Sequence, residues 1–517
     1  MQPSLLFCVL QKNTFNRKIC MKKTTLLLAA FLFSLISFSQ PKPTKTQVST
    51  NIKLTVHGLE KSEMILAFYS GDKQYVKDTI YSDSKGAFNI KADTALPGGI
   101  YLAVFPKLGN RYFEVIMSEP SFQMETDSGE LAGKMKITGS VENKLFYDDM
   151  LYLNKMRKYS DSINTILKAS SNPETTEKLK NELKKVDTDV KAKREGIVSD
   201  FPQLFYAKLI KAMKDPEVPE FPKDASGKII DSTFQWRWYK SHYWDNLDMN
   251  DDRLLRTPIF HNKLKQFFTK TVVQIPDSLI TASDEVLAKA DPKGDIFKYM
   301  LVYFLNNMAN AKIMGMDAVY VHLVKNYYSK GFATWVDSAQ LSKINERGAI
   351  LEPLLIGKKA LNFSLSDSTL KKFYTLYNLP NKYTVLCFWD PDCGHCKKEI
   401  PILLEAYHNL KKAGVDVEVV APAIMAKEHL DKWTSFIREK GLDWINVADP
   451  YRQSNFRYEW DIQSTPQIYI LDKNKMIKAK RLGAEQIEDF ILHEEDPNHK
   501  PKKPFMESEE QHTAEPH

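Results

Sequence analysis

The sequence predicts a multidomain fold with an N-terminal all-β sandwich, a central α-helical region and a C-terminal α/β domain. At 517 residues, the chain is too long for one hydrophobic core. The spacing of apolar residues changes from two to three or four near residue 143, and strands alternate with helices after residue 357. The formal charge of +7 is spread along the chain, so we expect no nucleic-acid partner.

Residues 1–40 contain an upstream segment followed by the pattern of a secretory signal peptide. Met21, Lys22 and Lys23 precede an apolar run at residues 26–36. This run is shorter than the roughly 20 residues that a transmembrane helix needs. We therefore expect export to the periplasm, with translation starting at Met21 rather than Met1. An uncleaved membrane anchor is the less favoured alternative.

Residues 48–140 are expected to form the β-sandwich-like domain, and residues 143–355 the helical domain. Ile52, Leu54 and Val56 alternate with polar residues, as in a half-buried strand. In the helical domain, the charged stretch 174–194 is either a coiled-coil-like hairpin arm or a solvated helix, and we favour the solvated helix. The aromatic residues at 236–244 are expected to pack the domain rather than to stack a ligand. Pro258 and Pro276 predict breaks between helices.

Residues 358–492 are expected to form the α/β domain, because strand patterns alternate with helical ones. The expected strands are Tyr383–Trp389, Val415–Val420, Gln467–Leu471 and Lys475–Leu482, and the expected helices are Cys396–Lys412 and Glu428–Lys440. Residues 493–517 are rich in Pro, Glu, Lys and His and carry almost nothing apolar, which predicts a disordered tail.

The chemistry is expected at Cys393 and Cys396, where a buried strand meets a helix. Of the 5 cysteines, those that follow the signal peptide lie within ten positions of one another, which favours redox or metal chemistry over structural disulfides. A helix N-terminus stabilises a thiolate, so Cys393 is the predicted nucleophile. Cys396, one turn further on, is the predicted resolving thiol.

Two other uses of the cysteine pair have little support. Structural zinc needs four ligands, and no second cysteine pair exists. Covalent haem attachment requires His directly after the second cysteine, and Lys397 stands there. We therefore expect no metal and no cofactor apart from the redox-active disulfide Cys393–Cys396. The intervening Gly394 and His395 are expected to tune the pair, with a cationic His395 favouring the Cys393 thiolate.

The residues around the pair resemble the thioredoxin superfamily over about 358–492. Trp389 precedes the cysteines, Pro401 lies in the following helix, and Thr465 and Pro466 precede a late strand. The resemblance implies a thioredoxin-like domain in which Pro466 is cis and packs beside the cysteines. It also implies that Thr465 offers its backbone to a bound polypeptide. Trp389 is expected to act with the intervening residues in redox tuning.

Within that superfamily, the Cys-x-x-Cys-Lys-Lys-Glu-x-Pro sequence is similar to the TlpA/ResA group of envelope thioredoxins. The group has an acidic residue at the position of Glu399, which implies that Glu399 adjusts the cysteine pKa values and proton transfer. One departure is Cys387, which stands where simple thioredoxins have a buried aspartate; we expect it to be an inert core residue. A second is Asp392, where a tryptophan commonly precedes the first cysteine.

The resemblance implies an envelope reductase of protein disulfides, with cytochrome c precursors as one candidate substrate class. A membrane electron donor such as a DsbD/CcdA-like protein would recharge it. Two alternatives stay open at this point. The Cys-Gly-His-Cys sequence resembles disulfide isomerases, so isomerisation or oxidation is the first alternative. The second is a binding or scaffold protein whose upstream domains capture an envelope partner.

Overall fold

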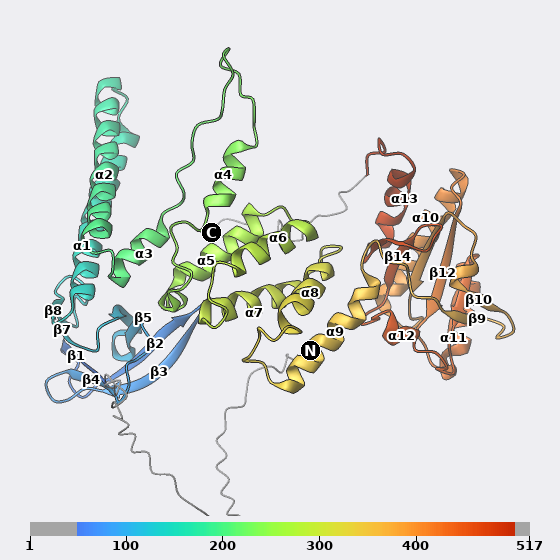
Figure 1. The fold of residues 1–517 in the computed structure, drawn as a ribbon, viewed down its shortest axis with the longest axis horizontal. Coiled ribbons are helices and arrows are strands. Elements are labelled where there is room, and N and C mark those ends of the chain that lie inside the picture. The colour runs from blue at the N-terminus through green and yellow to red at the C-terminus, as the bar shows by residue number, and fades with distance from the viewer. Residues whose placement is uncertain (1–48, 502–517) are drawn as a thin grey trace, which may run out of the picture. The chain divides into compact units, whose positions relative to one another are not determined.

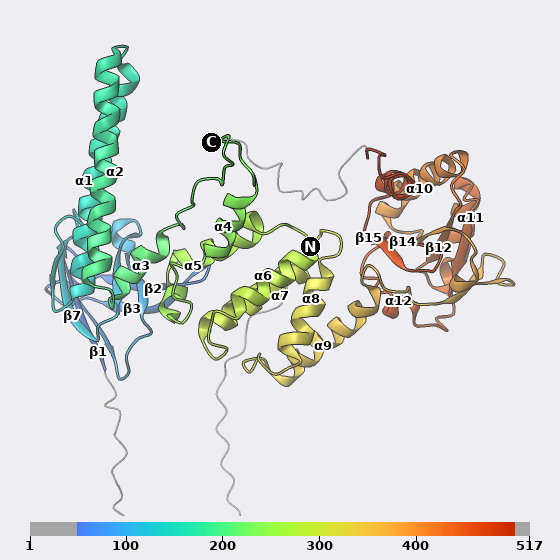
Figure 2. The same cartoon turned by 45° about the horizontal axis from the view of Figure 1, so that its top comes forward.

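The computed structural model describes residues 49–501 and confirms the multidomain fold, with β sheets, helices and an α/β domain in that order (Figures 1 and 2). The upstream segment and signal peptide predicted for residues 1–40 lie outside the described residues. Within residues 49–501, none of the helices combines the length and the apolar character that crossing a membrane requires.

The N-terminal domain contains two four-stranded sheets that share one core. One sheet has the order β4-β1-β7-β8 and the other the order β3-β2-β5-β6. Side chains of both sheets, such as Leu54 and Val115, belong to the same buried cluster, so the sheets pack as a sandwich. The strands are β1 (Thr50–His57), β2 (Glu63–Ser70), β3 (Lys73–Tyr81), β4 (Ala87–Ala92), β5 (Gly99–Phe105), β6 (Arg111–Met117), β7 (Ser121–Asp127) and β8 (Lys136–Thr138).

The central region is helical from residue 141 onward. Its α-helices are α1 (Val141–Ala169), α2 (Pro173–Asp200), α3 (Phe205–Met213), α4 (Phe234–His242), α5 (Pro258–Gln266), α6 (Pro276–Leu287), α7 (Asp295–Ala309), α8 (Asp317–Leu323) and α9 (Ser338–Leu351). Pro258 and Pro276 stand in the first turns of α5 and α6. A proline there lacks only an N–H that has no partner within the helix, so both prolines start helices as well as separating them.

The charged stretch 174–194 lies in α2, which packs along α1 as a helical hairpin (Figures 1 and 2). The stretch thus forms one arm of a hairpin, the alternative that we did not favour, although most of its residues are exposed, as expected of a solvated helix. Arg194 on α2 pairs with the buried Asp149 on α1 at 3.1 Å. Charge pairing and a narrow apolar seam at Ile163 and Val186 join the two helices, which explains why their hydrophobic pattern is weak.

The aromatic residues at 236–244 mainly pack the helical core, as predicted. Tyr243 and Trp244 are buried there, next to Phe267. Trp236 is 43% exposed, and its indole N–H donates to the Thr271 carbonyl at 3.1 Å.

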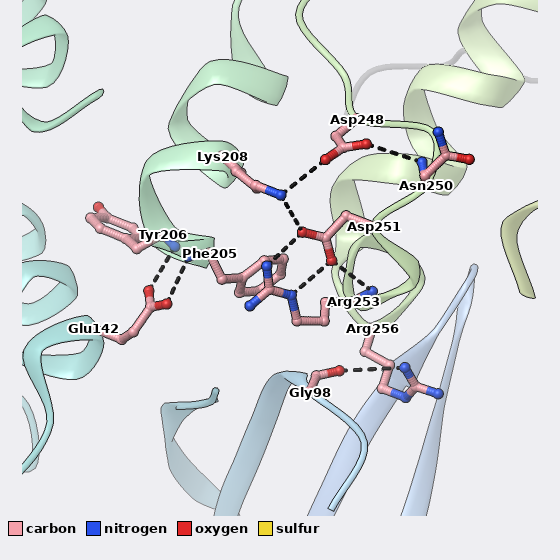
Figure 3. Close-up of polar contacts among 10 residues, drawn as sticks. All are labelled: Gly98, Glu142, Phe205, Tyr206, Lys208, Asp248, Asn250, Asp251, Arg253 and Arg256. Carbon is pink, nitrogen blue, oxygen red and sulfur yellow. Dashed lines mark hydrogen bonds and ion pairs between the residues drawn. The ribbon is translucent and has the colours of Figure 1, made fainter. Parts of the chain in front are cut away.

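A buried carboxylate holds the beginning of α3. Glu142 on α1 accepts hydrogen bonds from the backbone N–H groups of Phe205 at 2.7 Å and Tyr206 at 2.8 Å (Figure 3). Leu204, the N-cap residue of α3, has no side chain that could accept these bonds. Because the first N–H groups of a helix lack partners within it, Glu142 supplies the missing cap from a distant part of the sequence.

A polar network next to this cap connects the helical region with the β-sandwich. Asp251 accepts hydrogen bonds from Lys208 at 3.2 Å and from Arg253 at 2.6 and 2.7 Å (Figure 3). Arg256 donates to the Gly98 carbonyl, just before β5, at 3.4 Å. The helical turn Asp252–Arg256 is thereby held against the second sheet of the sandwich.

The C-terminal domain has a seven-stranded sheet of order β10-β9-β13-β12-β11-β14-β15. Strand β11 is parallel to β12 and antiparallel to β14. The strands are β9 (Ser364–Asp367), β10 (Phe373–Thr375), β11 (Tyr383–Phe388), β12 (Val417–Ala423), β13 (Ile445–Ala448), β14 (Gln467–Leu471) and β15 (Ile477–Lys480). The α-helices are α10 (Gly394–Lys412), α11 (Leu430–Lys440), α12 (Phe456–Glu459) and α13 (Ile487–Glu495).

The central strand β11 is buried along its whole length, because both faces of the sheet are covered. Val385 and Cys387 pack into one core cluster together with α10, and Leu386 and Phe388 pack into the other. This arrangement fixes the end of β11, and therefore the start of the loop that carries the two cysteines. The sequence did not reveal β9, β10 or β13, which are three or four residues long.

The prediction places the start of the disordered tail too early, at residue 493. Helix α13 continues to Glu495, and the His499 ring lies 3.1 Å from the Asp489 carboxylate. Residues 502–517, the rest of that segment, lie outside the described part of the chain.

Polar contacts also join the helical region to the C-terminal domain. Lys480 on β15 pairs with Asp317 on α8 and donates to the Leu354 carbonyl at 2.6 Å. Arg347 on α9 pairs with Asp461. Burial lowers the pKa of Lys480, and the adjacent Asp317 carboxylate opposes this effect.

Candidate active site

Cys393 and Cys396 lie where the loop after β11 enters α10. Cys393 is the N-cap residue: its backbone is extended, and its carbonyl accepts the Lys397 N–H at 3.1 Å. Cys396 is fully buried one turn further on, whereas Cys393 is partly exposed. Both are free thiols in this structure. The predicted nucleophile is therefore the thiol that a substrate can reach, and the predicted resolving thiol lies behind it.

The surroundings of the two sulfurs shift their pKa values in opposite directions. Burial opposes ionisation of Cys393, but it is outweighed by hydrogen bonds from the Cys396 backbone, the Thr465 and Cys396 side chains and the His395 backbone, so the pKa of Cys393 is lowered. For Cys396, burial dominates and raises the pKa to about 11, although the Asp390 N–H donates to its sulfur at 3.5 Å. Near neutral pH, the thiolate therefore forms preferentially on Cys393.

The loop before β14 brings Thr465 and Pro466 next to the nucleophile. The Cys393 thiol donates to the Thr465 carbonyl oxygen at 3.3 Å. The Thr465–Pro466 peptide bond is cis, as the resemblance implied. A polypeptide held along the Thr465 backbone would thus lie beside the Cys393 sulfur.

The two residues between the cysteines are both at the surface. His395 is exposed, and its backbone N–H is among the groups that lower the pKa of Cys393. Gly394 is also exposed, and a Cβ placed there would meet no atom within 4 Å. A side chain at position 394 would therefore find open space.

Trp389 lies under the active-site loop instead of at its surface. Its side chain is fully buried and packs against the Phe436 ring at 5.1 Å. Its backbone N–H donates to the Pro422 carbonyl at 3.1 Å, and its carbonyl accepts the Ile424 N–H at 2.7 Å. These bonds extend the pairing of β11 with β12 to the edge of the active site, so Trp389 positions the loop.

Glu399 and Cys387 lie on the inner side of the cysteine pair. Glu399 is half-buried on α10, and its carboxylate accepts the Ala484 N–H at 3.0 Å. Cys387 is buried on β11, and its pKa is raised first by burial and then by the nearby groups Cys396 and Glu399. Glu399 is thus a fixed group on the side of the buried thiol rather than a freely exposed helix residue.

Asp392 connects the active-site loop to the segment that begins α11. Its carboxylate lies 3.1 Å from Lys432 Nζ and 2.6 Å from His429 Nδ1. Hydrogen bonds from Lys432 and then His429 lower the pKa of Asp392. The sequence indicated only that Asp392 departs from the usual residue, because its two partners lie about forty positions further along the chain.

Across residues 49–501, no group of three or more His, Cys, Asp or Glu side chains is placed to hold a metal ion.

Three family models match successive parts of the chain. Residues 356–480 match the AhpC/TSA family, and residues 171–352 and 47–146 match two domains of unknown function, DUF5106 and DUF4369. The thiol-disulfide oxidoreductase ResA of Bacillus cereus is 28% identical over 143 residues, which cover 27% of this chain and 79% of the relative. ResA of Bacillus subtilis is 29% identical over 129 residues, which cover 25% of this chain and 68% of the relative.

Two solved structures are also similar. A domain of a possible thiol-disulfide isomerase from Cytophaga hutchinsonii is 40% identical, with a TM-score of 0.26, and the match covers 28% of this chain and 97% of that one. A thioredoxin-like protein from Bacteroides caccae is 20% identical, with a TM-score of 0.40, and the match covers 54% of this chain and 99% of that one.

The seven-stranded sheet, the Cys-x-x-Cys pair at the start of α10 and the matching oxidoreductases together define a thioredoxin-superfamily thiol:disulfide oxidoreductase. Its thioredoxin-like domain follows a β-sandwich and a helical region. Over the part of the chain that carries the cysteine pair, the similarity is to the ResA-like oxidoreductases, because the ResA relatives match these residues.

Proposed function

We propose that this oxidoreductase works as a reductase of protein disulfides in the cell envelope. The observation that carries the proposal is the asymmetry of the cysteine pair. Cys393 is partly exposed with a lowered pKa, whereas Cys396 is buried with a pKa raised to about 11. A reductase needs two thiols of different reactivity. One thiolate must attack the substrate disulfide first, and the other thiol must stay protonated until it resolves the mixed disulfide.

The proposed reaction has two steps. The Cys393 thiolate attacks one sulfur of a substrate disulfide, which forms a mixed disulfide and releases the other substrate sulfur as a thiolate. Cys396 then loses its proton and attacks Cys393 Sγ, which closes the Cys393–Cys396 disulfide and releases the second substrate thiol. Two electrons and two protons pass to the substrate in total. Glu399, held by the Ala484 N–H, is the proposed acceptor of the Cys396 proton, either directly or through water.

The oxidised pair must be reduced again before a second turnover. We propose a membrane electron donor of the DsbD/CcdA-like kind, which supplies two electrons by the same exchange in reverse. We propose cytochrome c precursors as one class of protein substrate. No cofactor takes part in this scheme apart from the redox-active disulfide itself.

Export is the proposed route to the envelope, and the apolar run at residues 26–36 after Lys22 and Lys23 supports it. N-terminal sequencing of the protein recovered from the periplasmic fraction tests this proposal. A first residue close to 40 is the expected result. Recovery in the cytoplasm with residues 21–40 still attached would contradict it.

A trapping experiment tests the reaction. The full chain carrying Cys396→Ser is mixed with an oxidised protein substrate, and it should accumulate a mixed disulfide through Cys393 that dithiothreitol releases. Cys393→Ser is the matched control, and it should trap nothing because the remaining thiol of the pair is buried and protonated. Equal trapping by both variants would overturn the assigned order of the two cysteines.

Isomerisation or oxidation is the second candidate function, because the lowered pKa of Cys393 is compatible with it as well. A stabilised thiolate makes the dithiol form more stable and the disulfide more oxidising. The two functions differ in whether electrons pass from the enzyme to the substrate in net terms. A reductase consumes dithiothreitol in proportion to the substrate disulfides that it opens, whereas an isomerase restores activity to a scrambled substrate without net consumption.

A further inference from the structure

A pocket of about 490 Å³ is lined by residues that lie close in the chain to the active-site loops. It lies between the residues that follow β12, the loop 449–455, α12 and the residues Ile462 and Gln463. Two connections place it next to the active site. The Ile424 N–H donates to the Trp389 carbonyl at 2.7 Å. Gln463 stands two residues before Thr465, whose carbonyl accepts the Cys393 thiol.

The floor of the pocket is apolar and its edge is cationic. Ile424, Phe456 and Ile462 line it and are 6–7% exposed, so they form a fixed apolar surface. Arg452 and Arg457 also line it, and both residues are exposed. The combination suits a side chain that has a short apolar stem and an anionic end.

The charges around the pocket favour an anion. Asp449 is the acidic residue in its lining, and its two carboxylate oxygens accept the Gln453 N–H at 2.9 Å and the Ser454 N–H at 2.7 Å. Asp449 is thus occupied by its own loop. For the side chains of Arg452 and Arg457, the described part of the chain shows neither an ion pair nor a hydrogen bond to another residue. Two guanidinium groups therefore remain available for a carboxylate, which they can bind through paired hydrogen bonds.

We propose that this pocket binds an acidic side chain, Asp or Glu, of the polypeptide whose disulfide Cys393 attacks. The inference rests on the proposed function, because it needs a polypeptide substrate aligned along the Thr465 backbone. Such a chain passes the pocket within a few residues of its reacting cysteine. The pocket thereby selects protein substrates with acidic residues near the disulfide.

The test uses the full-length reduced protein and three synthetic peptides, each with one intramolecular disulfide. The peptides are identical except at three positions next to the second cysteine. These three positions are all Glu in one peptide, all Gln in the second and all Lys in the third. Reduction in a single turnover is followed by acid quenching and chromatography, and the second-order rate constants for the three peptides are compared. The Glu peptide should react roughly 3- to 10-fold faster than the Gln peptide, and the Lys peptide should be the slowest. In about 0.5 M NaCl the preference should shrink, because exposed charges are screened.

The R452Q/R457Q double variant should bring the ratio between the Glu and Gln peptides close to one. R438Q is the matched control, because Arg438 is exposed on α11 and does not line the pocket, so it should keep the preference. Thermal unfolding checks that the double variant is folded. A preference that survives in the folded double variant would overturn the pocket assignment and leave the proposed function standing. Failure of the wild-type protein to reduce any of the peptides would instead refute the proposed function.

Discussion

The opposite pKa shifts of the two cysteines predict a large difference in their rates of alkylation. The pKa of Cys396 is raised to about 11, whereas that of Cys393 lies below its ordinary value of 9.0. At pH 7, a thiol of pKa about 11 is ionised in about one molecule in 10⁴. The two pKa values differ by at least about two units, so at pH 7 Cys393 carries at least about 100 times more thiolate than Cys396. The weaker nucleophilicity of the more acidic thiolate offsets about tenfold of this advantage, so Cys393 should react at least about 10 times faster.

Single-cysteine variants measure this difference directly. Cys396→Ser leaves Cys393 as the reactive thiol of the pair, and Cys393→Ser leaves Cys396, while Cys387 is unchanged in both. Rates of iodoacetamide alkylation, followed by mass spectrometry from pH 5 to 11, report each thiolate. Because the thiolate population rises with pH through the pKa, the midpoint of the Cys393 rate profile should lie below pH 9, and the Cys396 rate should still be rising at pH 10. Equal rates at pH 7, or a lower midpoint for Cys396, would refute the reasoning.

Three further predictions follow from individual side chains. Glu142→Ala leaves the N–H groups that cap α3 without their acceptor, so the free energy of unfolding should fall by about 2 kcal/mol in urea titrations, against under about 0.5 kcal/mol for the exposed Glu177→Ala. Cys387→Ala should lower the free energy of unfolding by about 1 kcal/mol in the same titration, while the variant should still reduce substrate disulfides. Loss of this activity in a folded variant would show that the Cys387 thiol takes part in the reaction. Glu399→Gln should slow the closing of the Cys393–Cys396 disulfide by about tenfold or more while Cys393 alkylation is unchanged, and equal slowing of both would argue against proton transfer.

The sequence predicted those features that local patterns determine. The pair at Cys393 and Cys396 was found from its spacing and from the change of strand to helix around it. Strand Gln467–Leu471 was predicted with the bounds that the structure has, because it is a clear apolar run after Pro466. Strand β13 was missed because four residues carry too little periodicity to separate a strand from a loop.

Other features depend on residues that are distant in sequence, and local patterns could not reveal them. Glu142 caps residues that lie 63 and 64 positions further along the chain. Asp392 contacts residues that lie 37 and 40 positions further along. Most residues of α2 are exposed, so its apolar pattern resembles that of a solvated helix and does not reveal that α2 packs along α1. The pocket with Arg452 and Arg457 forms only when the loop 449–455 meets the end of β12.

The redox potential of the Cys393/Cys396 pair tests the central claim most directly. The full-length protein is equilibrated with graded glutathione or dithiothreitol buffers, and free thiols are trapped and counted. We predict one reversible two-electron transition that is absent in Cys393→Ser. Its potential should lie clearly below the value of about −120 mV for the strong oxidant DsbA. A potential at or above about −120 mV would contradict a reductase, and no reversible transition at all would contradict the assigned site.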